Sequence, residues 1–336
     1  MPVHAPDGGT INAAIIEPAL YDPEIKVWYK ENQSQVKTNL NFPKLPAPPE
    51  TSAFKQLAKN KPFATYAGRL SGWLATVKID MPIGTVIMLP GFDMNRASLM
   101  PWALFFADRG WRVVLVDLRG QGTSSSPYLT WGIKDRDDLS RLVELLEAQH
   151  ILVHPWIYFG VSYGAGVALM AAGDRGHPDG VIAIAPWETA SGVIPRFAHS
   201  VAGGLAPGSA SPKWVSAEQQ AGRIAGINLQ EARPIDSVAS IPIPVLYLGG
   251  SADSVAPPEN IEMMAQKTRE ATVAIKKGLA HIVVVADVPG FCSSINDWLS
   301  ATLLKNPVRK CFVSKSVKNG LIEETYIGDK LSSESN

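Results

Sequence analysis

The sequence contains little cysteine, no excess of charge of either sign and no long apolar run. Its two cysteines, Cys292 and Cys311, form no metal-like cluster. We interpret them as ordinary thiols, with a disulfide bond between them as the alternative in an oxidising compartment. Lysine plus arginine and aspartate plus glutamate both total 31. No nucleic-acid partner or anionic membrane surface is therefore predicted, because such partners usually require a basic excess.

No stretch of the sequence is long and apolar enough to cross a bilayer. Residues 1–16 also lack the basic-then-apolar order of a secretory signal. We therefore predict a cytoplasmic protein without a transmembrane segment; removal of a signal from a longer precursor is the alternative. Hydrophobic residues make up 46% of the chain and charged residues 18%, which is typical of a globular protein with one large or two modest domains.

Residues 1–60 are rich in proline, and we predict that they form an irregular arm on the surface of the main domain. The prolines between residues 42 and 49 exclude a helix, because proline lacks an N–H and restricts the residue before it. From residue 63 onward, short apolar runs alternate with segments of helical spacing. The runs that we predict as strands are residues 63–70, 73–79, 85–89, 112–116, 156–159, 181–185, 244–248 and 272–276.

Strands that alternate with helices predict an α/β fold with mostly parallel pairing and a sheet covered by helices on both faces. We assign residues 61–187 and 241–304 to this core, with about eight strands counted from the runs above. The alternation is interrupted at residues 188–240, which are too long for a plain connection. We interpret this segment as a small inserted cap of short helices. Residues 305–336 form a polar C-terminal tail.

The strongest local signal is Gly-Val-Ser-Tyr-Gly at residues 160–164. It follows a strand run and precedes a helix-forming segment, which is the setting of a nucleophile elbow. The flanking glycines let strand and helix approach, and the tight turn exposes a serine hydroxyl at the carboxyl edge of the sheet, where ligands bind. The pattern predicts that Ser162 is a catalytic nucleophile. A simple turn is the alternative, because short motifs also occur by chance.

A serine hydroxyl needs a neighbouring base to become an effective nucleophile. His281 follows the last strand run, which brings it to the same edge of the sheet as Ser162, and we predict that it is the base. His199, in the cap, is a second candidate that could reach the site. The other histidines precede strand runs or lie in the arm, away from Ser162: His4, His150, His154 and His177.

The acid that orients the base is expected at another strand end. Asp253 follows the strand run at 244–248 and precedes His281, which agrees with the chain order Ser, Asp, His. Glu188, which follows the run at 181–185, is the alternative acid. A plain turn aspartate is the other interpretation of Asp253, because aspartate is common in turns.

Over residues 85–304 the sequence resembles the α/β-hydrolase superfamily, in particular its esterase, lipase and serine-aminopeptidase-like branches. Leu-Pro-Gly-Phe at 89–92 is similar to the family's oxyanion loop, with Pro90 where histidine is common. The resemblance implies that the backbone N–H groups of Phe92 and Tyr163 form an oxyanion hole. Residues 117–124 resemble a structural stretch, Asp-x-Arg-Gly-His-Gly-x-Ser, with Gln121 in place of histidine, so Asp117 and Arg119 are interpreted as structural.

The resemblance implies a serine hydrolase that cleaves small-molecule carboxylic esters through an acyl-enzyme, without a metal or organic cofactor. Met94, Trp131 and Trp187 are predicted to bind substrate at the same sheet edge, with apolar cap residues Ile194, Phe197 and Trp214 as further candidates for the pocket lining. An acyltransferase or peptidase with the same triad, and a catalytically silent ligand-binding protein, remain the alternatives, since a fold does not define a reaction. The sequence does not define the oligomeric state.

Overall fold

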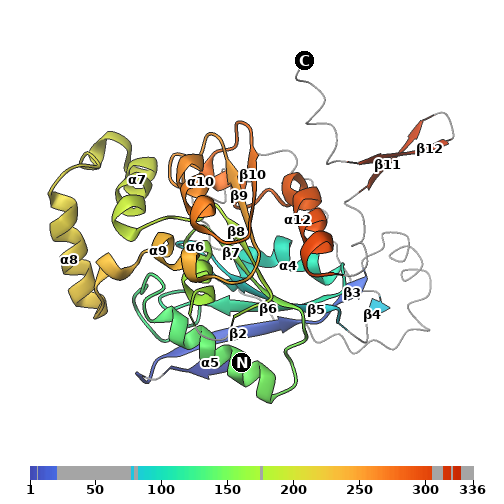
Figure 1. The fold of residues 1–336 in the computed structure, drawn as a ribbon, viewed down its shortest axis with the longest axis horizontal. Helices are drawn as coiled ribbons and strands as arrows, with labels where there is room; N and C mark the ends of the chain where they lie inside the picture. The colour runs from blue at the N-terminus through green and yellow to red at the C-terminus, as the bar shows by residue number, and fades with distance from the viewer. Residues whose placement is uncertain are drawn as a thin grey trace.

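A computed structural model of the chain describes residues 1–5, 7–20, 77–78, 82–174, 177–304, 313–318 and 321–326. Its centre is an eight-stranded sheet in the order β1-β2-β6-β5-β7-β8-β9-β10 (Figure 1). The strands β2 and β6 pair antiparallel, as do β1 and β2, and the other neighbours pair parallel. The strand bounds are β1 Pro2–His4, β2 Thr10–Ile16, β5 Gly84–Leu89, β6 Trp111–Asp117, β7 Trp156–Val161, β8 Gly180–Ile184, β9 Val245–Gly250 and β10 Ala271–Lys276.

Helices cover both faces of this sheet, which confirms the predicted architecture. Every residue of β5, β7, β8 and β9 is buried, and alternate side chains along the strands enter two separate apolar clusters. One cluster includes α5 (Asp135–Ala148), α6 (Tyr163–Ala172) and α10 (Pro258–Lys267). The other includes α4 (Met100–Ala107), α11 (His281–Val284) and α12 (Val288–Thr302). The 3-10 turn η1 (Arg96–Leu99) leads into α4.

The N-terminal arm was predicted as irregular, and this is wrong for its first residues. They form the hairpin of β1 and β2, which extends the central sheet beside β6. These strands replace the runs at 63–70 and 73–79 among the eight, and most of those two runs lie outside the described residues, as does the proline-rich stretch at 42–49. Pairing over a long sequence distance decides such short strands, because local strand preference is weak.

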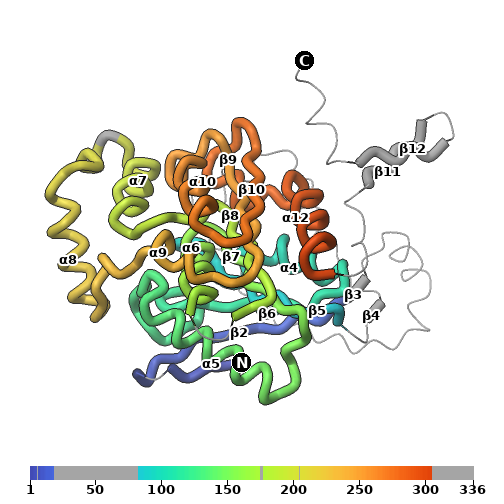
Figure 2. Tube along the Cα trace, viewed as in Figure 1, coloured from blue at the N-terminus to red at the C-terminus, as the bar shows by residue number. Residues whose placement is uncertain are grey.

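The segment that links β8 to β9 is helical. Figures 1 and 2 show its helices α7 and α8 projecting from one side of the sheet core. Few residues of α8 are buried, so its packing differs from that of the core helices. The elements of this cap are α7 Ala190–Ala202, η2 Gly203–Leu205, α8 Lys213–Ala225, η3 Leu229–Glu231, α9 Pro234–Ser237 and η4 Val238–Ser240.

Two further pairs of short strands lie outside the central sheet. The strand β3 (Ala19–Leu20) pairs with β4 (Val77–Lys78), and β11 (Val313–Lys318) pairs with β12 (Leu321–Tyr326) within the polar tail. Among the described stretches of chain, no helix combines the length and apolar character needed to span a membrane. Cys292 is buried in the core beside α4, and Cys311 lies outside the described residues.

Candidate active site

Ser162 lies at the junction of β7 and α6, in a backbone conformation that side chains rarely adopt. Its φ is 49° and its ψ is −111°, which stores strain that the surrounding structure must hold. A Cβ on Gly160 would lie 2.4 Å from the carbonyl oxygen of Gly164, and a Cβ on Gly164 would lie 2.2 Å from that of Leu89. Glycine at both positions is therefore a packing requirement of the turn. The turn projects the serine hydroxyl beyond the end of β7.

His281 and Asp253 meet Ser162 in one hydrogen-bonded chain. Ser162 Oγ lies 2.8 Å from His281 Nε2, and His281 Nδ1 lies 2.7 Å from Asp253 Oδ2. The other carboxylate oxygen of Asp253 accepts hydrogen bonds from the N–H groups of Val255, at 2.9 Å, and Ala256, at 2.8 Å. Both oxygens thus have partners, which fixes the carboxylate toward the imidazole. This is the geometry of an activated serine nucleophile.

Glu188, the alternative acid, has a different partner. Arg196 Nη2 donates to both of its carboxylate oxygens, at 2.8 and 2.6 Å. Arg196 Nε also donates to the carbonyl oxygen of Val255, at 2.8 Å, which ties α7 to the loop after β9. The structure therefore pairs Glu188 with the cap and does not bring it to His281. His199, the alternative base, has its Nδ1 3.0 Å from the carbonyl oxygen of Pro195, within its own helix.

The two backbone amides expected to bind an oxyanion lie beside Ser162. Phe92 follows β5 and lines the same cavity as Ser162. Tyr163 is the first residue of α6, so its N–H is one of the amides that a helix start leaves without an intrahelical acceptor. Within the described residues neither amide donates a backbone hydrogen bond outside a helix or strand. Both donors are available, and the positive end of the α6 dipole favours negative charge there.

A cavity of about 280 Å³ opens at Ser162 between the core and the cap. Trp131 and Trp187, which the sequence predicted to bind substrate, lie in its wall, and their rings meet edge to face with centroids 5.4 Å apart. Glu218 is the charged side chain among the described lining residues, and it accepts a hydrogen bond from Ser191. The remaining lining residues are Phe92, Tyr163, Val193, Ile194, Phe197, Ala198, Trp214, Ala217, Ala221, Leu229 and Val255.

Met94 does not join the residues that line this cavity. Its side chain packs against the core cluster beside α4, and its sulfur lies 2.7 Å from the place that a Cβ on Gly91 would take. The Met94 side chain thus packs against Gly91 within the loop after β5. Leu229 and Val255 are lining residues that the sequence did not predict, because single apolar residues in loops and short 3-10 turns carry no signal of their position.

A buried polar network around Asp135 joins two residues that line the cavity, Tyr163 and Trp131. The Tyr163 hydroxyl accepts a hydrogen bond from the Trp131 N–H at 2.9 Å and lies 3.4 Å from Asp135 Oδ2. Asp135 also accepts from the Thr130 hydroxyl at 2.6 Å and the Gly132 N–H at 2.9 Å. Burial raises the pKa of Asp135 and, together with the nearby Asp135 charge, raises the pKa of Tyr163 well above its usual value. The network holds Trp131 against the nucleophile helix.

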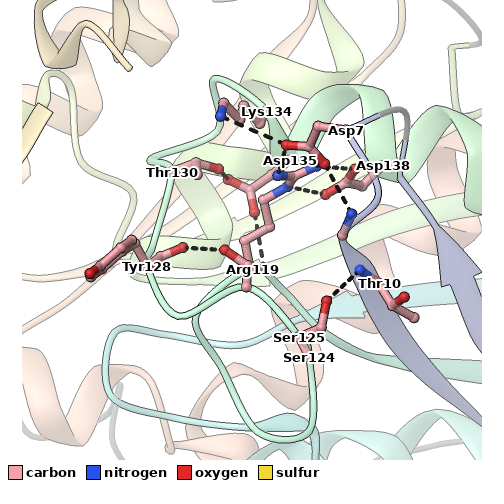
Figure 3. A network of polar contacts seen from close by, with 12 residues as sticks. Asp7, Thr10, Arg119, Ser124, Ser125, Tyr128, Thr130, Lys134, Asp135 and Asp138 are labelled. Atoms are coloured by element: carbon pink, nitrogen blue, oxygen red, sulfur yellow. Dashed lines mark hydrogen bonds and ion pairs between the residues drawn. The ribbon is translucent and has the colours of Figure 1, made fainter. Parts of the chain in front are cut away.

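Asp117 and Arg119 have the structural surroundings expected of them. Arg119 pairs with Asp138 at 2.6 Å and with Asp7 at 2.7 Å, so it joins α5 to the N-terminal hairpin (Figure 3). Asp117 accepts from the backbone N–H groups of Arg96 and Thr123 at 2.8 and 3.0 Å. Among the described residues, no group of three or more His, Cys, Asp or Glu side chains is arranged to hold a metal ion.

Comparison with known proteins gives one family match and several distant relatives. The pattern of the alpha/beta hydrolase family matches residues 86–291, more than half of the chain. YqkD of Bacillus subtilis (strain 168) is 28% identical over 200 residues, which are 56% of this chain and 61% of that protein. YfhR of Escherichia coli (strain K12) is 26% identical over 207 residues, 60% of this chain and 65% of that protein. The chain thus matches less than two thirds of the length of these relatives.

Solved structures with the same fold include hydrolases of low sequence identity. Est1E from Butyrivibrio proteoclasticus, bound to ferulic acid, has a TM-score of 0.55 and 16% identity, and the match covers 90% of this chain and 98% of that one. A Pyrococcus furiosus esterase has a TM-score of 0.54 and 18% identity over 66% of this chain and 84% of that one. At identities of 16% and 18%, these similarities show a shared fold.

Proposed function

Because the chain belongs to the alpha/beta hydrolase family, we propose that it is a serine hydrolase that cleaves carboxylic esters. The observation that carries the proposal is the hydrogen-bonded chain from Ser162 through His281 to Asp253, with distances of 2.8 and 2.7 Å. A serine and a histidine within hydrogen-bond reach, with the histidine oriented by a third group, are the structural signature of an activated nucleophile. The esterases among proteins of the same fold agree with this reaction class.

In the proposed reaction, Ser162 Oγ attacks the ester carbonyl carbon while His281 Nε2 accepts the hydroxyl proton. The tetrahedral intermediate collapses as its bond to the alcohol oxygen breaks, and His281 returns the proton to the leaving alcohol. Water then attacks the acyl-enzyme with the same histidine as base, which releases the acid and free Ser162. Asp253 holds the imidazole in the required tautomer and stabilises its charged form throughout.

The amides of Phe92 and Tyr163 are proposed as donors to the developing oxyanion. Such donors act where charge appears in the transition state, and loss of one costs about 3–4 kcal/mol. The cavity favours an apolar group on the ester, because aromatic and aliphatic side chains make up most of its wall and its volume is about 280 Å³. The substrate proposed is therefore a small-molecule ester with a compact apolar acyl or alcohol part.

Covalent labelling by a fluorophosphonate tests the proposal without knowledge of the natural substrate. We expect one adduct, mapped by peptide mass spectrometry to Ser162, because phosphonylation of an ordinary serine by this reagent is far too slow to observe. Ser162→Ala is expected to lose both the labelling and the hydrolysis of a short p-nitrophenyl ester. His281→Ala keeps the serine but is expected to suppress both readings. The absence of any adduct on folded protein would favour the catalytically silent, ligand-binding alternative, and an adduct on another serine would overturn the site.

A further inference from the structure

Among the described residues, the Gln121 side chain makes one hydrogen bond, and its acceptor belongs to the loop that carries the Phe92 amide. The Nε2 of this buried residue donates to the carbonyl oxygen of Gly91 at 2.7 Å. The Oε1 is also buried and has no hydrogen-bond partner among the described residues. Within the described residues, the side-chain amide of Gln121 is therefore linked to the rest of the protein only through the Gly91 carbonyl. The reverse orientation of the amide would set two oxygens 2.7 Å apart, so the donor must face the carbonyl.

The hydrogen bond determines where the next N–H points. Gly91 and Phe92 share one planar peptide unit, and the cis bond found in the described chain is at His154 and Pro155. In a trans peptide unit the C=O and the N–H point in opposite directions. A carbonyl of Gly91 held by Gln121 thus turns the Phe92 N–H away from Gln121. Gly91 itself borders the nucleophile, because a Cβ added to it would lie 3.6 Å from the Cβ of Ser162.

The loop that carries Gln121 is fixed by hydrogen bonds that do not involve the Gln121 side chain. Its own N–H donates to the carbonyl oxygen of Leu118 at 3.0 Å. Two later residues of the loop bond to Asp117: the Thr123 N–H at 3.0 Å and the Ser124 hydroxyl at 2.7 Å. The Met94 N–H also donates to Gly91, at 3.3 Å, and closes the turn from the other side. The Gly91 carbonyl thus accepts two hydrogen bonds, one from the Gln121 side chain and one from the Met94 N–H of its own turn, and together they fix its direction.

We propose that Gln121 is a positioning residue of the oxyanion hole, which orients the peptide unit from Gly91 to Phe92 so that the Phe92 N–H faces the oxyanion. The inference rests on the proposed ester hydrolysis. Gln121 touches neither the substrate nor the reacting atoms; it acts through the backbone. Preorganised donors stabilise a transition state only if they are already aimed at the charge that develops. Loss of the hydrogen bond from Gln121 to Gly91 should therefore weaken transition-state binding more than ground-state binding.

Gln121→Met tests this inference, because methionine has a similar length and no N–H donor. We expect kcat and kcat/KM for a short p-nitrophenyl ester to fall together by about 10- to 100-fold, less than the loss of a whole donor, with KM changed by less than about two-fold. Affinity for a trifluoromethyl ketone, which forms a tetrahedral oxyanion adduct with a serine, should fall by a similar factor. Gln121→His restores an N–H donor and is expected to recover most of kcat.

Ser126→Ala is the matched control, since it removes a hydrogen bond of 3.0 Å from side chain to backbone in the same loop, to the carbonyl oxygen of Tyr128, without touching Gly91 or the bonds to Asp117. It is expected to leave kcat and ketone affinity unchanged. All rates are counted per fluorophosphonate-titrated site, so partial unfolding does not lower them. If Gln121→Met does not fold, Gln121→Asn, which is too short to reach Gly91, takes its place with the same expected losses. An unchanged kcat in a folded variant overturns the inference while the esterase function stands; an unreactive wild type overturns both.

Discussion

Ser162 combines a strained backbone with neighbours that leave no room for other residues. Its positive φ is tolerated because Gly160 and Gly164 let β7, α6 and the end of β5 approach one another closely. The Ser162 N–H donates to the carbonyl oxygen of Ile184 at 2.8 Å, which ties the turn to the next strand. At the scale of the residue, then, the position of the Ser162 side chain is determined by contacts that the surrounding sheet imposes.

The two candidate acids have different partners, since Asp253 contacts His281 and Glu188 contacts Arg196. Asp253→Asn is expected to lower kcat by about 10³- to 10⁴-fold, because an amide supports the wrong imidazole tautomer. Glu188→Gln is expected to change kcat less than about ten-fold and to act mainly on the cap, since its carboxylate binds Arg196. Steady-state kinetics on one ester, with thermal melting of both variants, checks the ranking. The opposite ranking would move the acid to the strand before the cap.

The cap is the element that shapes the cavity. Its helices α7 and α8 contribute much of the apolar wall, while the core contributes Ser162 and the rings around it. Phe197 on α7 lies against Phe92, with ring centroids 4.9 Å apart, so it connects the cap to the loop that carries the Phe92 amide. Elements that surround a site without touching the reacting atoms usually alter specificity more than chemistry.

Phe197→Ala should therefore shift the preference among acyl chains. Removal of the ring enlarges the cavity, so kcat/KM for a hexanoyl or octanoyl ester should rise relative to that for the acetyl ester, by about three- to ten-fold. Kinetics on p-nitrophenyl esters of graded length measures this ratio. Leu205→Ala, which alters a cap residue that is 92% exposed, is the control and should leave the ratio unchanged. The same ratio in both variants would mean that Phe197 only packs the cap.

At the scale of the whole molecule, the N-terminal hairpin completes one side of the sheet and is joined to the core by charge. Arg119 lies between Asp7 of the hairpin and Asp138 of α5, and its own pKa is raised, chiefly by the hydrogen bond with Asp138 (Figure 3). The hydrogen bond from Arg119 in turn lowers the pKa of Asp7 to about 2. Folding thus favours the charged form of Asp7.

Asp7 should make stability depend on pH with a defined sign. A pKa lowered from 3.8 to about 2 contributes stability that is present above pH 3.8 and is lost as the pH falls toward 2. The Asp7 side chain is 45% exposed, so screening by solvent limits the contribution to about 0.5–1 kcal/mol. Asp7→Asn should lower the unfolding free energy by that amount at pH 7 in urea titrations, and the difference from wild type should shrink below pH 4. A difference independent of pH would exclude the charge as its cause.

Much of this architecture and the chemistry of the site followed from local patterns in the sequence. The order of Ser162, Asp253 and His281, each after a strand run, predicts their convergence, because parallel strands end at one edge of a sheet. The burial of β5, β7, β8 and β9 likewise follows from their continuous apolar runs. Such inferences succeed where one short segment carries both the strand signal and the reactive residue.

Other features were decided by tertiary structure, because their partners are distant in the sequence or lack a local signature. The hairpin of β1 and β2 became part of the sheet only by pairing with β6, about a hundred residues later in the chain. The choice between Asp253 and Glu188 depended on Arg196, whose guanidinium occupies one carboxylate and leaves the other to His281. Gly91 is contacted by the Met94 side chain and by a hydrogen bond from Gln121, and neither contact has a signature in the local sequence. Sequence determines which groups reach the edge of the sheet; folding determines which of them face one another, because hydrogen bonds and contacts form between surfaces rather than along the chain.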